Sequence, residues 1–157
     1  MNHFITLADL PNFNQTLNLA MDFKKDPSKL NTLGKGKTLG LLFFNPSLRT
    51  RLSTQKAAQN LGLSTMVMNF SQESWASEFE DGTKMSGLRS EHVREAAAVV
   101  SQYCDMIAIR AFASLSDKEK DEAEIVLKSF TEYASVPIIN MESATCLLYT
   151  SPSPRDS

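Results

Sequence analysis

Short apolar runs alternate along the chain with longer stretches in which apolar residues recur every three or four positions. The short runs predict four buried strands, at Thr38–Phe44, Ser64–Asn69, Asp105–Arg110 and Val136–Asn140. The periodic stretches predict helices at Asn12–Lys25, Arg49–Leu61, Ser90–Tyr103 and Asp117–Ala134. Strands that alternate with helices favour an α/β fold, a parallel sheet of about four strands with helices on both faces.

Several ends of the predicted helices carry local signals. Asn12 or Asn14 is suited to cap the first helix, Gly62 to close the second, and Ser90 to cap the third. Apolar side chains recur at helical spacing in three of the helices: Phe13, Leu17 and Met21; Val93, Ala96, Ala97 and Val100; and Ile125, Val126, Phe130 and Tyr133. We expect the last of these sets to point inward.

The turn between the first strand and the second helix combines two arginines with two hydroxyl groups. Its residues are Ser47, Leu48, Arg49, Thr50 and Arg51. Free backbone N–H groups and the positive end of the helix dipole favour an anion at such a helix N-terminus. No acidic residue between Phe43 and Gln72 offsets the two cations. A bound phosphate is therefore predicted, and solvated surface arginines are the ordinary alternative.

Polar residues also follow the ends of the other predicted strands. Ser47, Arg110 and Glu142 lie at or just beyond the ends of three of them. Ligands collect outside the carboxyl ends of the strands in a parallel sheet. The three side chains are therefore expected to converge on one edge of the sheet.

Composition limits the classes of partner. The chain has 157 residues, 42% hydrophobic and 22% charged, which suits one soluble globular domain. A formal charge of -2 argues against a nucleic-acid partner, since tracking phosphates needs clustered Lys and Arg. No apolar stretch approaches the roughly 20 residues that span a bilayer, so we expect no membrane partner. The N-terminus lacks the charged and apolar regions of a signal peptide, so we expect a cytoplasmic location. No Cys, His and Asp spacing predicts a metal site.

Four motifs in order carry a resemblance to a known family. Ser47-Leu48-Arg49-Thr50-Arg51 resembles the Ser-x-Arg-Thr-Arg signature of the aspartate/ornithine carbamoyltransferases. The three other stretches are Glu73-Ser74-Trp75, Ile109-Arg110-Ala111-Phe112 and Asn140-Met141-Glu142-Ser143-Ala144-Thr145. Together they are most similar to the branch that acts on N-acylated ornithine in arginine biosynthesis. The resemblance covers residues 1–145, which we expect to form the carbamoyl-phosphate-binding domain of a truncated chain.

The resemblance implies a role for each matching residue. It assigns carbamoyl phosphate to Ser47, Leu48, Arg49, Thr50, Arg51, Trp75 and Arg110. Arg110 would also be catalytic, at the carbamoyl carbonyl, and Glu142 would contact the N-acylornithine. Trp75 would reach the site of a neighbouring subunit in a homotrimer. The resemblance implies no cofactor or metal. The family histidine after the position of Thr145 is missing here. The resemblance also implies a second α/β domain that binds the amino acid and that this chain lacks, so this chain alone is expected to lack transferase activity.

Ser90 bears on the choice of acyl group. It matches a position that separates acetyl from succinyl users in the N-acylornithine branch. A glutamate there would repel the second carboxylate of a succinyl group, whereas Ser90 carries no charge. The resemblance therefore favours N-succinyl-L-ornithine, with N-acetyl-L-ornithine or plain ornithine as alternatives. A further alternative is a phosphate-binding module without catalysis.

Residues 146–157 differ in composition from the rest of the chain. Pro152 and Pro154 break both helical and strand periods. Cys146 to Asp156 can be back-translated into a string that resembles a transposase-type sequencing adapter read in frame. We therefore interpret residues 146–157 as a non-native tail and exclude them from the predicted domain.

Overall fold

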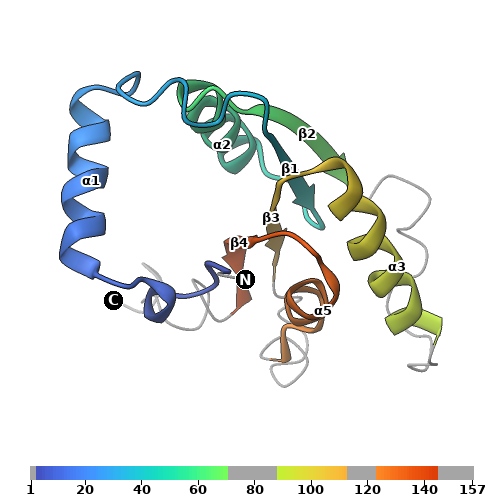
Figure 1. Ribbon diagram of the computed structural model, residues 1–157. Helices are drawn as coiled ribbons and strands as arrows, with labels where there is room; N and C mark the ends of the chain where they lie inside the picture. The colour runs from blue at the N-terminus through green and yellow to red at the C-terminus, as the bar shows by residue number, and fades with distance from the viewer. Residues whose placement is uncertain (1–2, 71–87, 113–122, 145–157) are drawn as a thin grey trace.

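A four-stranded parallel sheet forms the centre of the described residues (Figure 1). This computed structural model describes residues 3–70, 88–112 and 123–144. The strands are β1 (Thr38–Phe43), β2 (Ser64–Asn69), β3 (Met106–Ala111) and β4 (Ile138–Ser143). They lie in the order β2-β1-β3-β4, and each neighbouring pair is parallel. The predicted parallel sheet is confirmed.

Helices cover both faces of this sheet, as predicted (Figure 1). The helices within the described residues are η1 (Leu7–Asp9), α1 (Phe13–Lys25), α2 (Leu48–Asn60), α3 (Leu88–Tyr103) and α5 (Ile125–Tyr133). Successive side chains of a strand point to opposite faces. Leu41 and Phe43 of β1 therefore pack in one cluster with Ala58 of α2, whereas Leu42 packs in the other with Phe130 of α5.

The strand order creates a topological switch between β1 and β3. The chain runs from β1 to β2 on one side, then crosses to β3 on the other side of β1 and continues to β4. In open parallel sheets, ligands bind at the carboxyl ends of the strands at such a switch. The turn after β1 and the last residues of β3 meet at this place.

The first described residues add a short backbone pairing to the outer edge of β4. The Phe4 N–H donates to the Ile138 carbonyl at 2.8 Å, and the Asn140 N–H donates to the Phe4 carbonyl at 2.9 Å. The Ile138 N–H donates to His3 Nδ1 at 3.1 Å. These bonds satisfy part of the sheet edge and hold the strand that carries Glu142.

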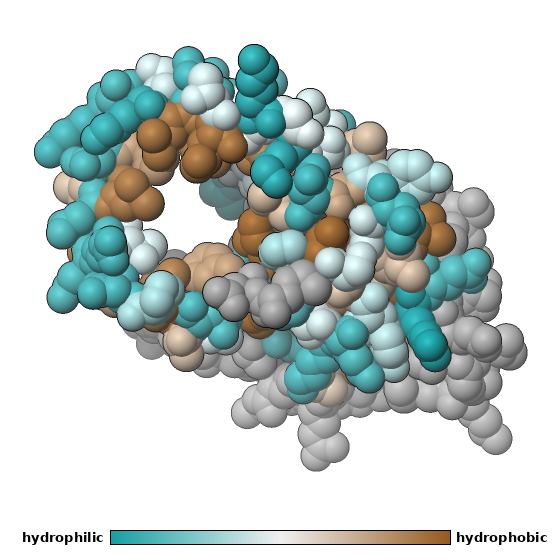
Figure 2. Space-filling model, in the orientation of Figure 1, coloured by the Kyte–Doolittle hydropathy of each residue, from teal (hydrophilic) through white to brown (hydrophobic). Residues whose placement is uncertain are grey.

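Helix α1 begins where the sequence predicts but does not bury its apolar face. The Oδ1 of Asn12 accepts a hydrogen bond from the Gln15 N–H at 3.0 Å, so Asn12 is the N-cap. No residue of α1 is buried, and Phe13, Leu17 and Met21 are 54%, 49% and 51% exposed. Figure 2 shows hydrophobic residues along the opening between α1 and the rest of the chain.

Three details of the predicted helices are wrong. Helix α3 begins at Leu88, so Ser90 is its third residue and not its cap, because Leu and Arg extend a helix at little cost. The helix expected over 117–134 is broken at Glu124, whose φ of 45° is left-handed. Ile125 was expected to point inward and is 44% exposed, since it lies about 200° around the helix from the buried Leu127.

Candidate anion-binding site

Ser47 caps α2 and shapes the turn that follows β1. Its Oγ accepts a hydrogen bond from the Thr50 N–H at 3.3 Å and donates one to Thr50 Oγ1 at 3.0 Å. Other N–H groups in the first turn of a helix have no intrahelical acceptor, and this first turn holds no acidic residue. The positive end of the helix dipole therefore meets Arg49 at the same place, which favours an anion.

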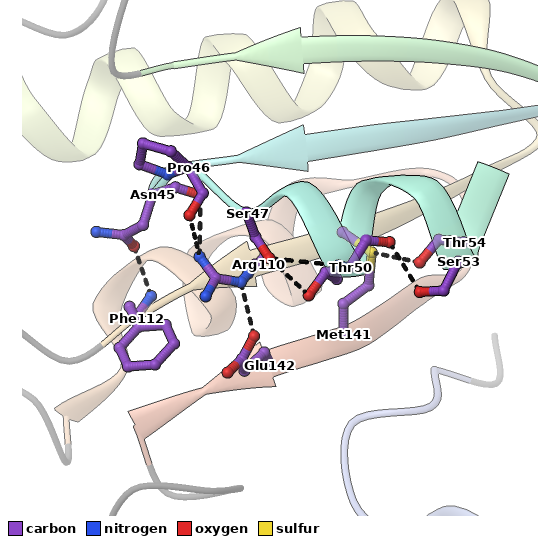
Figure 3. Close-up of polar contacts among 10 residues, drawn as sticks. All are labelled: Asn45, Pro46, Ser47, Thr50, Ser53, Thr54, Arg110, Phe112, Met141 and Glu142. Atoms are coloured by element: carbon purple, nitrogen blue, oxygen red, sulfur yellow. Dashed lines mark hydrogen bonds and ion pairs between the residues drawn. The ribbon is translucent and has the colours of Figure 1, made fainter.

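Arg110 lies near the carboxyl end of β3 and is held on several sides (Figure 3). Its side chain is almost fully buried. Nε donates to Glu142 Oε2 at 2.6 Å, and Nη1 donates to the backbone carbonyls of Asn45 at 3.0 Å and Pro46 at 3.2 Å. The guanidinium also lies over the Phe112 ring, 4.6 Å from its centre. These contacts join the turn after β1 to β3 and β4.

Glu142 reaches Arg110 because of an irregularity in the sheet. It lies inside β4, and not beyond a strand that was predicted to end at Asn140. The β3–β4 register shifts between Ile109 and Arg110, so that Ile109 pairs with Asn140 but Arg110 pairs with Glu142. Paired residues share a face of a sheet, and a shift of one residue moves a side chain to the other face. The bulge therefore brings the carboxylate to the guanidinium.

A cavity of about 460 Å³ opens between the N-terminal half of α2 and the ends of β3 and β4. Its lining residues are Ser47, Arg49, Thr50, Ser53, Thr54, Arg110, Met141 and Glu142. The expected convergence of Ser47, Arg110 and Glu142 is confirmed. The cavity lies at the switch between β1 and β3, so fold and side chains indicate the same place.

Of the other residues named from the sequence, Leu48 and Arg51 are described and do not line this cavity. Leu48 is 73% exposed. Arg51, the fourth residue of α2, is also exposed. Trp75 lies outside the described residues, as do residues 145–157. Ser90 is described only through its backbone in α3. Their roles stay predictions.

Sequence reasoning gave no role to three residues that line the cavity, Ser53, Thr54 and Met141, or to Asn45, whose carbonyl accepts a hydrogen bond from Arg110. Ser53 and Thr54 could have been found, because they lie three and four positions after Thr50 and so share its helix face. The Thr54 hydroxyl donates to Met141 Sδ at 3.6 Å, across to β4. The long-range contacts of Asn45 have no sequence signal beyond its place before a proline.

The described residues hold no group of three or more His, Cys, Asp or Glu arranged to bind a metal ion. Burial raises the pKa of the Cys104 thiol, and nearby Asp105 adds to the effect. Cys104 does not line the cavity, so this thiol takes no part in the site. Within the described residues, no helix is both long and apolar enough to cross a membrane.

The cavity offers cations, hydroxyls and a helix N-terminus on one side and a carboxylate on the other. That arrangement, at the switch of a parallel sheet, is typical of an α/β domain suited to binding a small anion. The sequence model for the carbamoyl-P binding domain of aspartate/ornithine carbamoyltransferases matches residues 2–146. The chain belongs to this family, and the resemblance found in its motifs is confirmed.

Two curated relatives show where the chain lies within the family. It is 43% identical over 145 residues to the N-succinylornithine carbamoyltransferase of Bacteroides thetaiotaomicron, covering 92% of this chain and 46% of that protein. It is 41% identical over 147 residues to the N-acetylornithine carbamoyltransferase of Xanthomonas campestris, covering 92% and 43%. The chain thus spans less than half the length of these relatives.

Solved structures share the fold. One is a glutamate-to-serine variant of N-acetyl-L-ornithine transcarbamylase complexed with carbamyl phosphate and N-succinyl-L-norvaline. It matches with a TM-score of 0.76 and 42% identity, over 90% of this chain and 43% of that one. Another is acetylornithine transcarbamylase complexed with acetylcitrulline, with a TM-score of 0.74, 38% identity, and 90% and 42% covered.

Proposed function

We propose that this chain is the carbamoyl-phosphate-binding part of an N-succinyl-L-ornithine carbamoyltransferase of arginine biosynthesis. The observation that carries the proposal is the cavity at the β1–β3 switch, which is lined by the hydroxyls of Ser47 and Thr50 and by Arg49 and Arg110. The family match and the relatives support the choice of carbamoyl phosphate over other small anions.

The proposed reaction needs binding and charge stabilisation more than covalent help from the protein. The side-chain amine of ornithine attacks the carbonyl carbon of carbamoyl phosphate, the C–O bond to phosphate breaks, and the attacking nitrogen loses a proton. The α2 N-terminus and Arg49 hold the phosphate, which also stabilises it as the leaving group. Arg110 is the group placed to stabilise the negative charge that develops on the carbonyl oxygen.

Glu142 is proposed to contact the N-acylornithine. Its carboxylate lines the cavity opposite the α2 turn, and its Oε2 is bonded to Arg110 Nε. A carboxylate at this position attracts the amine and disfavours a second anion. The two substrates would therefore meet at neighbouring side chains, with the phosphate toward α2 and the amine toward β4.

The succinyl assignment rests on the similarity to the Bacteroides enzyme and on the uncharged Ser90. Serine, alanine, valine and proline variants at one glutamate of the N-acetyl enzyme are each complexed with a succinylated ligand, which supports a link between the absence of that glutamate and the succinyl group. N-acetyl-L-ornithine remains the alternative, since N-acetylornithine carbamoyltransferases match at 41% identity. Homotrimer formation with Trp75 at a neighbouring site is part of the proposal, and sedimentation of the full-length protein tests it.

Titration of the purified chain with carbamoyl phosphate in a calorimeter tests the anion site. The expected result is saturable binding that weakens at least about tenfold in Arg49→Ala, because a charge-assisted contact is lost. Lys56→Ala is the matched control, since Lys56 is an exposed cation of the same helix that does not line the cavity. Equal weakening in both variants would reduce the effect to net charge, and absence of binding to the unaltered chain would refute the proposed ligand.

The substrate is tested with a full-length protein that contains this domain. We expect faster carbamoylation of N-succinyl-L-ornithine than of N-acetyl-L-ornithine when product is quantified by mass spectrometry. Ser90→Glu should reverse that preference, because the new carboxylate repels the succinyl group. A preference for the acetyl substrate in the unaltered protein would replace the succinyl assignment and leave the carbamoyl phosphate site unaffected.

A further inference from the structure

Asn45 makes contacts that a turn residue before proline does not require. Asparagine in a turn commonly bonds to a backbone group two residues further along its own chain. Here Asn45 Oδ1 accepts instead from the Phe112 N–H at 2.7 Å, between residues 67 positions apart in the chain. The bond is short and partly buried, and it connects the turn that follows β1 to the end of β3.

This bond continues the β1–β3 ladder with a side chain. The Phe44 N–H donates to the Arg110 carbonyl at 3.0 Å, which is a regular parallel ladder bond. A parallel ladder that continued in register would next offer the Phe44 carbonyl to the Phe112 N–H. Asn45 Oδ1 accepts that hydrogen bond, at the point where the backbone turns toward α2. One ladder bond is thereby made after the strand has ended.

The same residue also holds the guanidinium of Arg110 directly. Its backbone carbonyl accepts from Arg110 Nη1 at 3.0 Å, and the Pro46 carbonyl accepts from the same nitrogen at 3.2 Å. The Phe112 ring, whose backbone Asn45 fixes, lies under the guanidinium. Asn45 thus acts on Arg110 by two routes, one through its own carbonyl and one through Phe112 (Figure 3).

We propose that Asn45 is a positioning residue: its side-chain carbonyl holds the end of β3 so that the Arg110 guanidinium keeps one orientation at the anion cavity. The proposal rests on the proposed function for the identity of the anion, and on the contacts alone for the link between Asn45 and Arg110. Asn45 does not line the cavity, so it acts through Arg110 and not on the ligand.

The link is tested first without ligand, in the purified chain, by NMR. In Asn45→Ala we expect the Phe112 amide to exchange with solvent at least about tenfold faster and the Arg110 Nε–H signal to shift or broaden. Asn45→Asp keeps an acceptor oxygen at the same place and should restore both signals. Asn60→Ala, at the far end of α2, is the matched control and should change neither. If Asn45→Ala does not fold, Asn45→Ser replaces it in the test. The serine side chain is too short to reach the Phe112 N–H, so the same changes in the two signals are expected.

The consequence for the ligand is tested by titrating the same proteins with carbamoyl phosphate. We expect Asn45→Ala to bind about fivefold to tenfold more weakly and Asn60→Ala to bind as the unaltered chain does. Unchanged Phe112 and Arg110 signals in Asn45→Ala would overturn the link between Asn45 and Arg110. Changed signals with unchanged affinity would overturn the claim that this link matters for the anion. If the unaltered chain binds no carbamoyl phosphate, the proposed ligand fails, and the two NMR signals still decide whether Asn45 positions Arg110.

Discussion

Replacing Arg110 with methionine leaves the Glu142 carboxylate without its cation. The two side chains are 9% and 17% exposed and their atoms lie 2.6 Å apart, so solvent screens the pair only weakly. The substitution also removes the donor to the carbonyls of Asn45 and Pro46. Removing one partner of a buried ion pair costs about 3–5 kcal/mol, and the residual exposure of Glu142 places the expected loss near the lower end, about 3 kcal/mol. That is a large share of the about 5–15 kcal/mol that stabilises a typical domain.

The double variant separates the stranded charge from the lost packing. Replacing a buried pair by apolar residues of similar size is often close to neutral, so Arg110→Met with Glu142→Leu should recover about 2 kcal/mol of the loss. Urea unfolding followed by far-ultraviolet circular dichroism measures all the variants at one protein concentration. Arg94→Met is the control: Arg94 is exposed and lies 5.4 Å from the centre of the Tyr133 ring, so its loss should cost less than about 1 kcal/mol.

Two results would refute this reasoning about the ion pair. The free energy of unfolding of Arg110→Met could lie within about 1 kcal/mol of that of the unaltered chain. The Glu142 carboxylate would then be hydrated, or bonded to another donor, at little cost in free energy. Alternatively, the double variant could be no more stable than Arg110→Met alone. The loss would then come from the guanidinium's bonds to the turn after β1 and not from the unpaired carboxylate.

Ser47→Ala removes the N-cap of α2 and should lower the free energy of unfolding by about 1 kcal/mol in the same urea assay. Gly40→Ala places a methyl carbon 2.8 Å from Cys104 Sγ and should lower the thermal midpoint; Cys104→Ala in the same chain should restore part of it, and no recovery would contradict the contact. Backbone N–H groups of Thr6 and of the residue before it hold the pKa of the Asp9 carboxyl below its usual range. The stabilisation that Asp9 gives to the N-terminal turn is therefore complete above the ordinary Asp pKa and is lost as the pH falls through the lower pKa of the folded state. Hydrogen exchange of the Thr6 amide should become faster over that range of pH.

Local sequence patterns were sufficient for the sheet and for the place of the site. Apolar runs of strand length between periodic helical stretches predicted the four strands, and β2 matches its predicted bounds, Ser64–Asn69. The anion turn could be recognised because Ser47, Arg49 and Thr50 are neighbours in the chain. The meeting of Arg110 with that turn followed from the alternation of strands and helices along the chain. Strands joined by helical crossovers are parallel, so their carboxyl ends lie at one edge of the sheet.

The sequence by itself determined the α/β class through periodicity and the family through its four motifs. It also determined that Ser47, Arg49 and Thr50 lie together at the cavity, because they are neighbours in the chain. Only the tertiary structure decided that Glu142 meets Arg110, since a one-residue shift in the β3–β4 register selects which side chain faces the guanidinium. The tertiary structure also decided the role of Asn45, whose acceptor finds its donor 67 residues away. Such pairings depend on strand order and register, which arise from the packing of the whole sheet and leave no local pattern in the sequence.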